Sequence, residues 1–272
     1  MMTEGYKARF SGIERLYGRQ ALTRFHGAHV AVVGLGGVGS WAAEALVRSG
    51  VGAITLIDLD EVCISNTNRQ LHALDGQVGR PKVDALGDRL AAINPECRIV
   101  RELAFVTAAN VERLIGAELD GVIDAIDSIK AKAALIAHCK RQRIPVVCAG
   151  GAGGQIDPTQ VTVADLSRTT QDPLLAKLRN KLRREYGFSR NPKRRFGIEA
   201  VYSTEQLVYP ASDGEVCYQK PAEGGPVRLD CATGFGASSC VTATFGFVAA
   251  SRMLARLARQ ARAEEPNPES AS

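Results

Sequence analysis

The sequence predicts an α/β protein whose mostly parallel, Rossmann-like sheet carries helices on both faces. Short apolar runs alternate with helix-like segments between residues 29 and 148, and this alternation is typical of parallel sheets. A glycine-rich turn follows the first apolar run, as it does in nucleotide-binding folds. We expect an N-terminal helical arm before this region and, after it, a C-terminal part with mixed strands and a closing helix.

The expected elements follow the hydrophobic pattern in chain order. Residues 6–27 form the helical arm, with apolar positions at Leu16, Leu22 and Phe25. Strands are expected at 29–33, 53–57, 98–103, 121–125 and 144–148, and helices at 40–49, 81–93, 106–115 and 129–141. Later strand-like runs are separated by polar loops, at 160–164, 198–202 and 215–219, before a helix at about 236–262.

Composition and pattern divide the chain into four parts. The chain has 272 residues, of which 45% are hydrophobic, and a formal net charge of +5. Such a chain can bury a large core, and its charge favours an anionic partner. The expected parts are an arm at 1–28, a Rossmann-like half at 29–155, a second half at 156–262 and a disordered tail at 263–272.

Cysteine spacing and hydropathy exclude other classes of protein. The seven cysteines are scattered without a C-x-x-C pair, which disfavours a disulfide framework and a structural zinc site. The N-terminus has no apolar signal segment, so we expect a cytoplasmic protein. Residues 231–251 carry no charge and are long enough to span a membrane, but their serines, threonines and glycines favour a buried core helix.

The first chemical motif is a glycine-rich turn between an expected strand and an expected helix. Its glycines allow a tight turn and close approach to phosphate, and the helix N-terminus attracts anions. Asp58 ends the next strand, where a carboxylate accepts hydrogen bonds from a ribose. The motif predicts a nucleotide site that contains Gly34, Gly36, Gly37, Gly39 and Asp58.

Charged residues after Asp58 favour ATP over a nicotinamide cofactor. A site that cleaves between phosphates must neutralise the triphosphate, and Arg69 and Lys82 suit that role. Asp127 follows the strand at 121–125 and can hold Mg²⁺ through oxygen. The neighbouring Asp124 is expected to be an orienting acid at the end of the strand. A Rossmann oxidoreductase needs no such cations and is the less favoured alternative.

These motifs together resemble the ubiquitin-activating-enzyme-like adenylyltransferases, which include the molybdopterin and thiamine pathway enzymes. The resemblance rests on G-x-G-G-x-G-S, IDLD at 57–60, SNTNRQ at 65–70, GRPK at 79–82 and DAID at 124–127. It implies that Asp58 and Asp60 belong to the nucleotide site, that Asn66, Arg69 and Lys82 contact phosphates, and that Asp127 binds Mg²⁺. It also implies a homodimer in which Arg15 reaches the triphosphate bound to the neighbouring subunit.

Further segments resemble the family of bacterial tRNA threonylcarbamoyladenosine dehydratases over about residues 6–258. They are RFSG and RLYG in the arm, GSWAAEAL at 39–46, NTNRQLHAL at 66–74, GGAGGQIDPT at 150–159, QDPL at 171–174 and DCATGFG at 230–236. The resemblance implies ATP-dependent cyclisation of a modified adenosine beside the tRNA anticodon. Adenylation would activate the substrate carboxylate, and a tethered carbamoyl nitrogen or oxygen would close the ring.

A basic segment follows in the second half of the chain. Between residues 177 and 195 only Glu185 opposes the positive charges, and we expect tRNA to bind there. The interleaved Tyr186, Phe188 and Phe196 are expected to stack on unpaired bases. The predicted tRNA-binding residues are Lys177, Arg179, Lys181, Arg183, Arg184, Arg190, Lys193, Arg194 and Arg195.

Several assignments stay open from the sequence alone. Cys231 either takes part in catalysis, as cysteines do in related enzymes that form thioesters, or lines the site structurally. The glycines of 150–154 permit close approach of substrate or a monovalent cation, or simply a tight turn. Packing is favoured for Cys63, and a role without chemistry for His72. A cysteine-desulfurase or sulfur-acceptor partner also remains open.

Two alternative functions compete with tRNA modification. Adenylation of a ubiquitin-like sulfur-carrier protein would use the same ATP residues, but it leaves the basic segment unexplained. A non-catalytic tRNA or sulfur-transfer adaptor would not need the combined set of phosphate-binding residues. We therefore expect a carboxylate-adenylating dehydratase.

Overall fold

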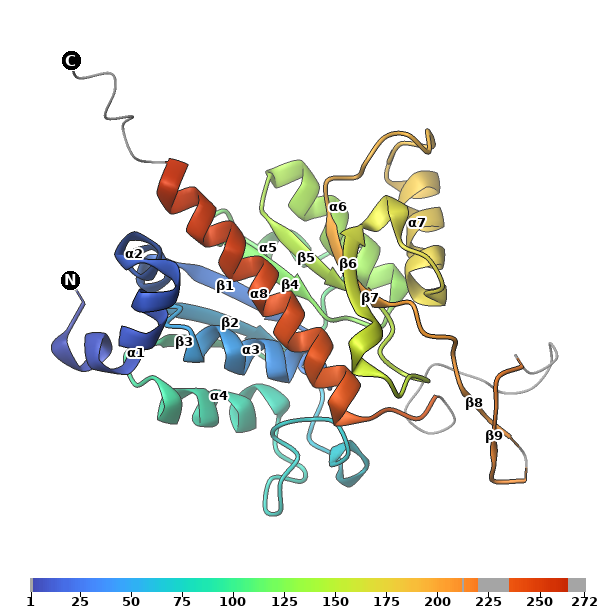
Figure 1. The fold of residues 1–272 in the computed structure, drawn as a ribbon, viewed down its shortest axis with the longest axis horizontal. Helices are drawn as coiled ribbons and strands as arrows, with labels where there is room; N and C mark the ends of the chain where they lie inside the picture. Colours follow the sequence, from blue (N-terminus) through green and yellow to red (C-terminus); the bar gives the residue numbers. More distant parts are fainter. Residues whose placement is uncertain (1, 212, 220–234, 264–272) are drawn as a thin grey trace.

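One seven-stranded sheet organises the molecule (Figure 1). The structure is a computed structural model that describes residues 2–211, 213–219 and 235–263. The strand order is β3-β2-β1-β4-β5-β7-β6, and every pair is parallel except β7 with β6. The strands are β1 (His29–Val33), β2 (Ala53–Ile57), β3 (Arg98–Glu102), β4 (Gly121–Asp124), β5 (Val146–Ala149), β6 (Val161–Asp165) and β7 (Glu199–Ser203).

Helices cover both faces of this sheet, as the sequence predicts. Alternate side chains of β1 enter two different cores: Val30 and Val32 face one, and Ala31 and Val33 face the other. The first core is closed by α2 (Arg19–Gly27), α3 (Gly39–Arg48), α4 (Lys82–Ile93) and α8 (Ser239–Ala263). The second is closed by α5 (Val111–Leu114), α6 (Ile129–Gln142) and α7 (Pro173–Glu185). The expected α/β fold class is confirmed.

The expected N-terminal helical arm consists of two helices. Helix α1 (Glu4–Tyr17) ends at Gly18, whose φ of 93° breaks the helix before α2 begins. The Tyr6 hydroxyl donates to the carbonyl of Gly50, which follows α3. Figure 1 therefore shows α1 at the amino edge of the sheet, where β1, β2 and β3 begin.

The basic segment also differs from expectation, because it begins as helix α7 and not as a polar loop. Asp172 caps this helix by accepting from the amide of Leu175 at 2.8 Å, and Pro173 occupies its first turn. Leu174, Leu178 and Leu182 then fall on one buried face. Because many basic residues lie between these leucines, the segment is polar on average and its helical periodicity is not evident from the sequence.

Two other segments depart from the sequence pattern. The helix expected at 106–115 is reduced to the single turn of α5. The run at 215–219 contains β9 (Val216–Cys217), which pairs with β8 (Tyr209–Pro210) outside the main sheet. The described residues also contain three short 3-10 helices: η1 (Ile64–Asn66), η2 (Pro158–Gln160) and η3 (Leu166–Arg168). The expected tail lies largely outside the described residues.

Helix α8 belongs to the core. Val241, Phe245 and Met253 are fully buried on the side that packs against α2, α3 and the sheet. Within the described residues, one helix, over Ser239–Arg262, is long and apolar enough to cross a membrane, and more than half of its apolar window is buried inside the protein. Its length and hydropathy are therefore accounted for by packing.

Candidate adenylation site

The glycine turn joins β1 to α3 at the carboxyl edge of the sheet. Gly34 adopts a φ of 86°, and a Cβ there would lie 2.8 Å from the carbonyl oxygen of Ala125. A Cβ on Gly39 would lie 1.8 Å from the oxygen of Gly34. Only glycine fits at both positions, so the backbone can close tightly around the first turn of α3. This geometry suits an anion.

Asp58 connects the end of β2 to this turn. One carboxylate oxygen accepts from the amide of Leu35 at 2.6 Å, and the other accepts from the amide of Asp60 at 2.8 Å. Burial raises the pKa of Asp58, while the charge of Lys82 and the two backbone amides oppose that rise. Each oxygen retains a second lone pair that can accept a ribose hydroxyl.

Lys82 begins α4 and lies close to Asp58. Its side chain is only 7% exposed, and its ammonium group donates to the carboxylate of Asp60 at 2.8 Å. The backbone amide of Lys82 also donates to the carbonyl of Asp60, at 2.9 Å. A buried lysine with one exposed carboxylate partner can transfer its hydrogen bonds to a phosphate.

The loop at 62–80 brings two more predicted residues to the glycine turn. The carbonyl of Arg69 accepts from the indole of Trp41 on α3 at 3.1 Å, and a Cβ on Gly37 would lie 3.2 Å from the Arg69 side chain. Asn66 is buried and accepts from the amide of Cys63 at 3.0 Å. The predicted glycines, Asp58, Asp60, Asn66, Arg69 and Lys82 therefore gather at one edge of the sheet.

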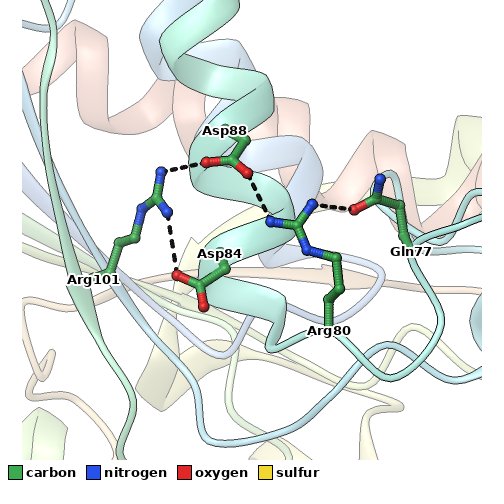
Figure 2. Close-up of polar contacts among 5 residues, drawn as sticks. All are labelled: Gln77, Arg80, Asp84, Asp88 and Arg101. Carbon is green, nitrogen blue, oxygen red and sulfur yellow. Dashed lines mark hydrogen bonds and ion pairs between the residues drawn. The ribbon is translucent and has the colours of Figure 1, made fainter.

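A network of charged side chains closes the base of this loop (Figure 2). Arg80 donates to Gln77 and to Asp88, both at 2.7 Å. Arg101 on β3 donates to Asp88 at 2.7 Å and to Asp84 at 3.2 Å. The two arginines hold the pKa of Asp88 below its usual range. We call these five residues the loop clamp.

The loop clamp acts close to a predicted phosphate-binding residue. The amide of Val62 donates to the carbonyl of Arg80 at 2.9 Å, and the amide of Gly79 donates back to Val62 at 2.9 Å. Lys82 follows Arg80 by two residues, so the clamp and these two backbone hydrogen bonds define where α4 starts. The sequence did not reveal the clamp, because its partners come from a loop, a helix and a strand.

Two aspartates at the end of β4 have different environments. Asp124 is fully buried and forms an ion pair with Lys132 at 3.0 Å, whereas Asp127 is exposed. Lys132 also donates to the carbonyl oxygen of Ile126 at 2.9 Å. Burial alone would lower the pKa of Lys132, but the Asp124 carboxylate raises it. Lys132, which the sequence reading missed, thus fixes the segment that carries Asp127.

The donor set at this edge fits Mg²⁺ bound with a nucleotide. Mg²⁺ commonly uses one or two carboxylates together with substrate phosphates and water. Asp127 offers an exposed carboxylate directly after Ile126, and Ala125 of the same segment lies against the glycine turn. Asp124 is committed to Lys132, as expected of an orienting acid.

The glycines at 150–154 follow β5 at the same edge. A Cβ on Gly150 would lie 1.9 Å from the carboxylate of Asp172, and the amide of Gly151 donates to that carboxylate at 2.9 Å. Asp172 therefore joins this run to the first turn of α7. The amide of Gly154, with a φ of 72°, donates to the carbonyl of Gly236 at 2.7 Å.

Buried polar side chains without partners lie near the glycine turn. His72 is almost fully buried, and burial together with Lys82 lowers its pKa to about 4. Among the described residues, neither of its ring nitrogens has a hydrogen-bond partner, and the same holds for one oxygen each of Gln70 and Thr242. Such groups ordinarily meet water or a ligand. His72 is thus a neutral imidazole at this site.

The remaining residues of interest are Arg15, Cys63 and Cys231. Arg15 is exposed near the end of α1, and within the described ranges no hydrogen bond or ion pair joins it to the site of its own chain. Cys63 is exposed on the 62–80 loop, so its expected packing role is wrong. Cys231 lies outside the described residues.

Basic side chains of this segment line a cavity beside α7 and lie exposed on the loop after it. Lys130, Lys177, Lys181 and Arg184 line a cavity of about 440 Å³ between α6 and α7. Both Lys181 and Arg184 share the carboxylate of Glu185, so the cavity keeps a positive excess. Farther along the chain, residues 190 and 193–195 are exposed.

The expectation that Phe196 stacks on bases is wrong. Phe196 is 3% exposed and packs against Phe188 with ring centroids 4.9 Å apart. The guanidinium of Arg183 lies 5.5 Å from the centre of the same ring. Phe188 and Tyr186 are half-buried against this core. The aromatic residues therefore support the basic surface from beneath.

Comparisons with known proteins agree with this geometry. Over 264 residues the chain is 55% identical to the tRNA threonylcarbamoyladenosine dehydratase of Escherichia coli (strain K12), which covers 96% of this chain and 98% of that protein. The dehydratase of the same name from Haemophilus influenzae is 49% identical over 257 residues, covering 94% and 96%. The crystal structure of the E. coli dehydratase in complex with ATP has a TM-score of 0.87 and 49% identity, and covers 97% of this chain and 100% of that chain.

The match extends well beyond the nucleotide-binding half. Residues 10–269 match the ThiF family, a span that includes most of the arm, the glycine turn, the basic segment and α8. The chain is a member of the ThiF family.

Proposed function

We propose that this protein is an ATP-dependent tRNA threonylcarbamoyladenosine dehydratase. The observation that carries the proposal is the gathering of the glycine turn, Asp58, Arg69 and Lys82 at one edge of the sheet. The near full-length identity to dehydratases supports it, since a sulfur-carrier adenylyltransferase would share only the nucleotide half of these features. The protein acts in the cytoplasm.

The chemistry begins at the substrate carboxylate, which is a poor electrophile. A carboxylate oxygen attacks the α-phosphorus of ATP, the bond to the β-phosphate bridging oxygen breaks, and pyrophosphate leaves with its electrons. Lys82 and Arg69 neutralise the charge that develops on the phosphates. Asp58 holds the ribose, with Asp60 and Asn66 maintaining the surrounding backbone. Bound at Asp127, Mg²⁺ would supply further charge neutralisation.

Ring closure follows on the acyl-adenylate. A nitrogen or oxygen of the carbamoyl group attacks the activated carbonyl carbon, AMP leaves with the bonding electrons, and a carbamoyl N–H loses its proton. The net change in the nucleoside is the loss of one water. Because the nucleophile is tethered to the electrophile, proximity supplies much of the rate. No thiol is required, and we assign Cys231 no chemical step.

The tRNA binds to the basic surface of α7 and the loop that follows. Its phosphates contact residues 177–195 and Lys130, and the glycines of 150–154 receive the modified nucleotide or a monovalent cation. Residues 29–155 then serve as the ATP half and residues 156–262 as the tRNA half. Arg15 acts on the active site of the second subunit in a homodimer.

A direct assay tests this function. Purified protein is incubated with ATP, Mg²⁺ and tRNA that carries threonylcarbamoyladenosine. The tRNA is then digested to nucleosides, whose masses are measured by mass spectrometry. We expect ATP-dependent loss of one water, which Lys82→Ala abolishes and Arg141→Gln, at an exposed ion pair of α6, leaves intact. An unchanged nucleoside mass with folded, ATP-binding protein would contradict the proposal.

A further inference from the structure

A second basic cavity lies at the free edge of the sheet. Its volume is about 520 Å³, and it is bordered by β6, the start of β7, η3 and α8. Its charged lining consists of Arg168, Arg195, Arg252, Arg256, Asp165 and Glu199. We call it the edge pocket.

Neither acid of the edge pocket is available to balance the whole set of arginines. Asp165 accepts from the amides of Phe196 and Gly197, at 2.9 and 2.7 Å, so its carboxylate holds the turn before β7. Glu199 pairs with Arg252 and, at 2.8 Å, with Arg256.

The two remaining arginines keep their charges uncompensated. Across the part of the chain that the structure describes, no carboxylate forms an ion pair with Arg168 or Arg195. Arg168 makes one long hydrogen bond, 3.4 Å, to the carbonyl of Lys193. Both side chains are exposed. A guanidinium group is suited to paired hydrogen bonds with a phosphate.

The edge pocket lies at the opposite end of the strands from the adenylation site. Glu199 is the first residue of β7, which runs parallel to β5, and Asp165 is its partner in register on β6. The pocket therefore opens at the amino edge, whereas the glycine turn follows the carboxyl end of β1. Strands of five residues separate the two edges by about 17 Å along the strands, and the four strand spacings from β1 to β6 add about 19 Å across the sheet.

We propose that the edge pocket binds backbone phosphates in the helical stem of the tRNA, away from the nucleotide that is modified. The proposal rests on the proposed function. Arg195 belongs both to this pocket and to the basic segment. Basic side chains therefore extend from the loop after α7 to the pocket beside β6 and α8. The two offsets together place the pocket on the order of 25 Å from the glycine turn, a distance that several base pairs of a helical stem can span. The loop nucleotide can then occupy the adenylation site while the adjoining stem reaches Arg168.

The test compares two RNA ligands without turnover. One is a hairpin with the anticodon stem and loop, and the other is a single-stranded oligonucleotide with the loop sequence alone. Affinity is measured by fluorescence anisotropy over a range of salt concentrations for the wild type, Arg168→Gln and Arg113→Gln. Arg113 is an exposed arginine on α5 and provides the matched loss of charge.

We expect Arg168→Gln to bind the hairpin more weakly and with a shallower salt slope. Each lost contact to a duplex phosphate reduces the slope of log K against log salt by about 0.9. Affinity for the loop oligonucleotide and for ATP should stay at wild-type values, as should the melting temperature. Arg113→Gln should match the wild type throughout.

Other outcomes overturn the proposal. Hairpin affinity and salt slope equal to the wild type would show that the stem does not occupy the pocket. Equal losses of affinity for the hairpin and for the loop oligonucleotide would show that Arg168 contacts the loop instead of the stem. If inorganic phosphate protects the pocket arginines from chemical modification but the hairpin does not, the pocket holds a free anion. Tight hairpin binding together with failed dehydration would instead contradict the proposed function alone.

Discussion

At the scale of single residues, the adenylation site depends on charges that are held in buried positions. Lys82 pairs with the carboxylate of Asp60 beside the glycine turn, and its charge opposes the rise that burial causes in the pKa of Asp58. Lys132 and Asp124 form a fully buried pair behind the segment that carries Asp127. Removing one member of either pair leaves the other charge without its partner. We expect the loss of Lys82 to affect function and the loss of Lys132 to affect stability.

Lys82→Met should remove the activity while leaving the fold intact. The variant keeps the aliphatic stem but not the ammonium group that would neutralise phosphate charge, and losing one such group costs about 100-fold in rate. Exchange of labelled pyrophosphate into ATP, in the presence of the tRNA substrate, measures the adenylation step directly. Arg141→Gln is the control, and exchange within a few-fold of wild type in Lys82→Met would refute the assigned phosphate site.

Lys132→Met should destabilise the protein by about 3–5 kcal/mol, because Asp124 would remain as an unpaired buried carboxylate. The double variant Lys132→Met with Asp124→Leu should recover much of that loss, since both charges are then removed. Urea denaturation of both variants and of Asp124→Leu completes a double-mutant cycle. Additive losses in the cycle would mean that the two side chains are not coupled.

At the scale of elements, the 62–80 loop is held in place by the loop clamp. The clamp joins the loop to α4 through Asp88 and to β3 through Arg101 (Figure 2). Its acids and arginines are partly exposed, so each ion pair is worth only about 0.2–1 kcal/mol. The clamp therefore affects the position of the loop more than the stability of the whole protein.

Asp88→Asn should weaken ATP binding without stopping catalysis. With the clamp loosened, Lys82 and Arg69 lose part of their fixed geometry, and we expect KM for ATP to rise about twofold to fivefold with kcat little changed. Steady-state kinetics provide the measurement, with Asp88→Glu as the conservative variant that restores KM. Glu112→Gln removes an exposed pair elsewhere and should leave KM unaltered. A lower kcat at unchanged KM would place Asp88 in another role.

The clamp should also open in acid. The pKa of Asp88 is lower in the folded protein than in the unfolded chain, because Arg80 and Arg101 stabilise its charged form. The stabilisation is therefore present above the ordinary carboxyl pKa and is lost as the pH falls through the lower folded value. Hydrogen-exchange protection factors for residues 63–79 should decrease across that acidic range in the wild type. In Asp88→Asn, protection should already be low at neutral pH; high protection would show that the loop is held by other contacts.

At the scale of the whole molecule, the sequence predicted the strand and helix order closely but not the contacts between distant segments. The apolar run of β1 and the glycine turn after it are local signals, and the phosphate-binding residues follow at characteristic spacings. The Arg80–Asp88–Arg101 contacts join three elements and leave no local pattern. Helix α7 was missed because its leucines are interspersed with basic residues, and the break at Gly18 required knowledge of its backbone angle.

The position of the N-terminal arm bears on the proposed homodimer. Helix α1 packs at the amino edge through Tyr6 and Gly50, whereas the glycine turn lies at the carboxyl edge (Figure 1). Arg15 thus lies apart from the site of its own chain, and its proposed role requires a second subunit. A two-fold dimer would exchange both arms and complete two equivalent sites.

Mixing inactive variants tests this arrangement. Arg15→Ala and Lys82→Ala are each expected to be inactive as homodimers. After random subunit exchange in equal amounts, half of the dimers are mixed, and in each of these one site combines a native Lys82 with a native Arg15 from the other subunit. Dehydration should therefore recover to about a quarter of the wild-type rate. If Arg15 served its own chain, both sites of every mixed dimer would lack one residue, and mixing would restore nothing. Native mass spectrometry of differently tagged subunits verifies that exchange has occurred.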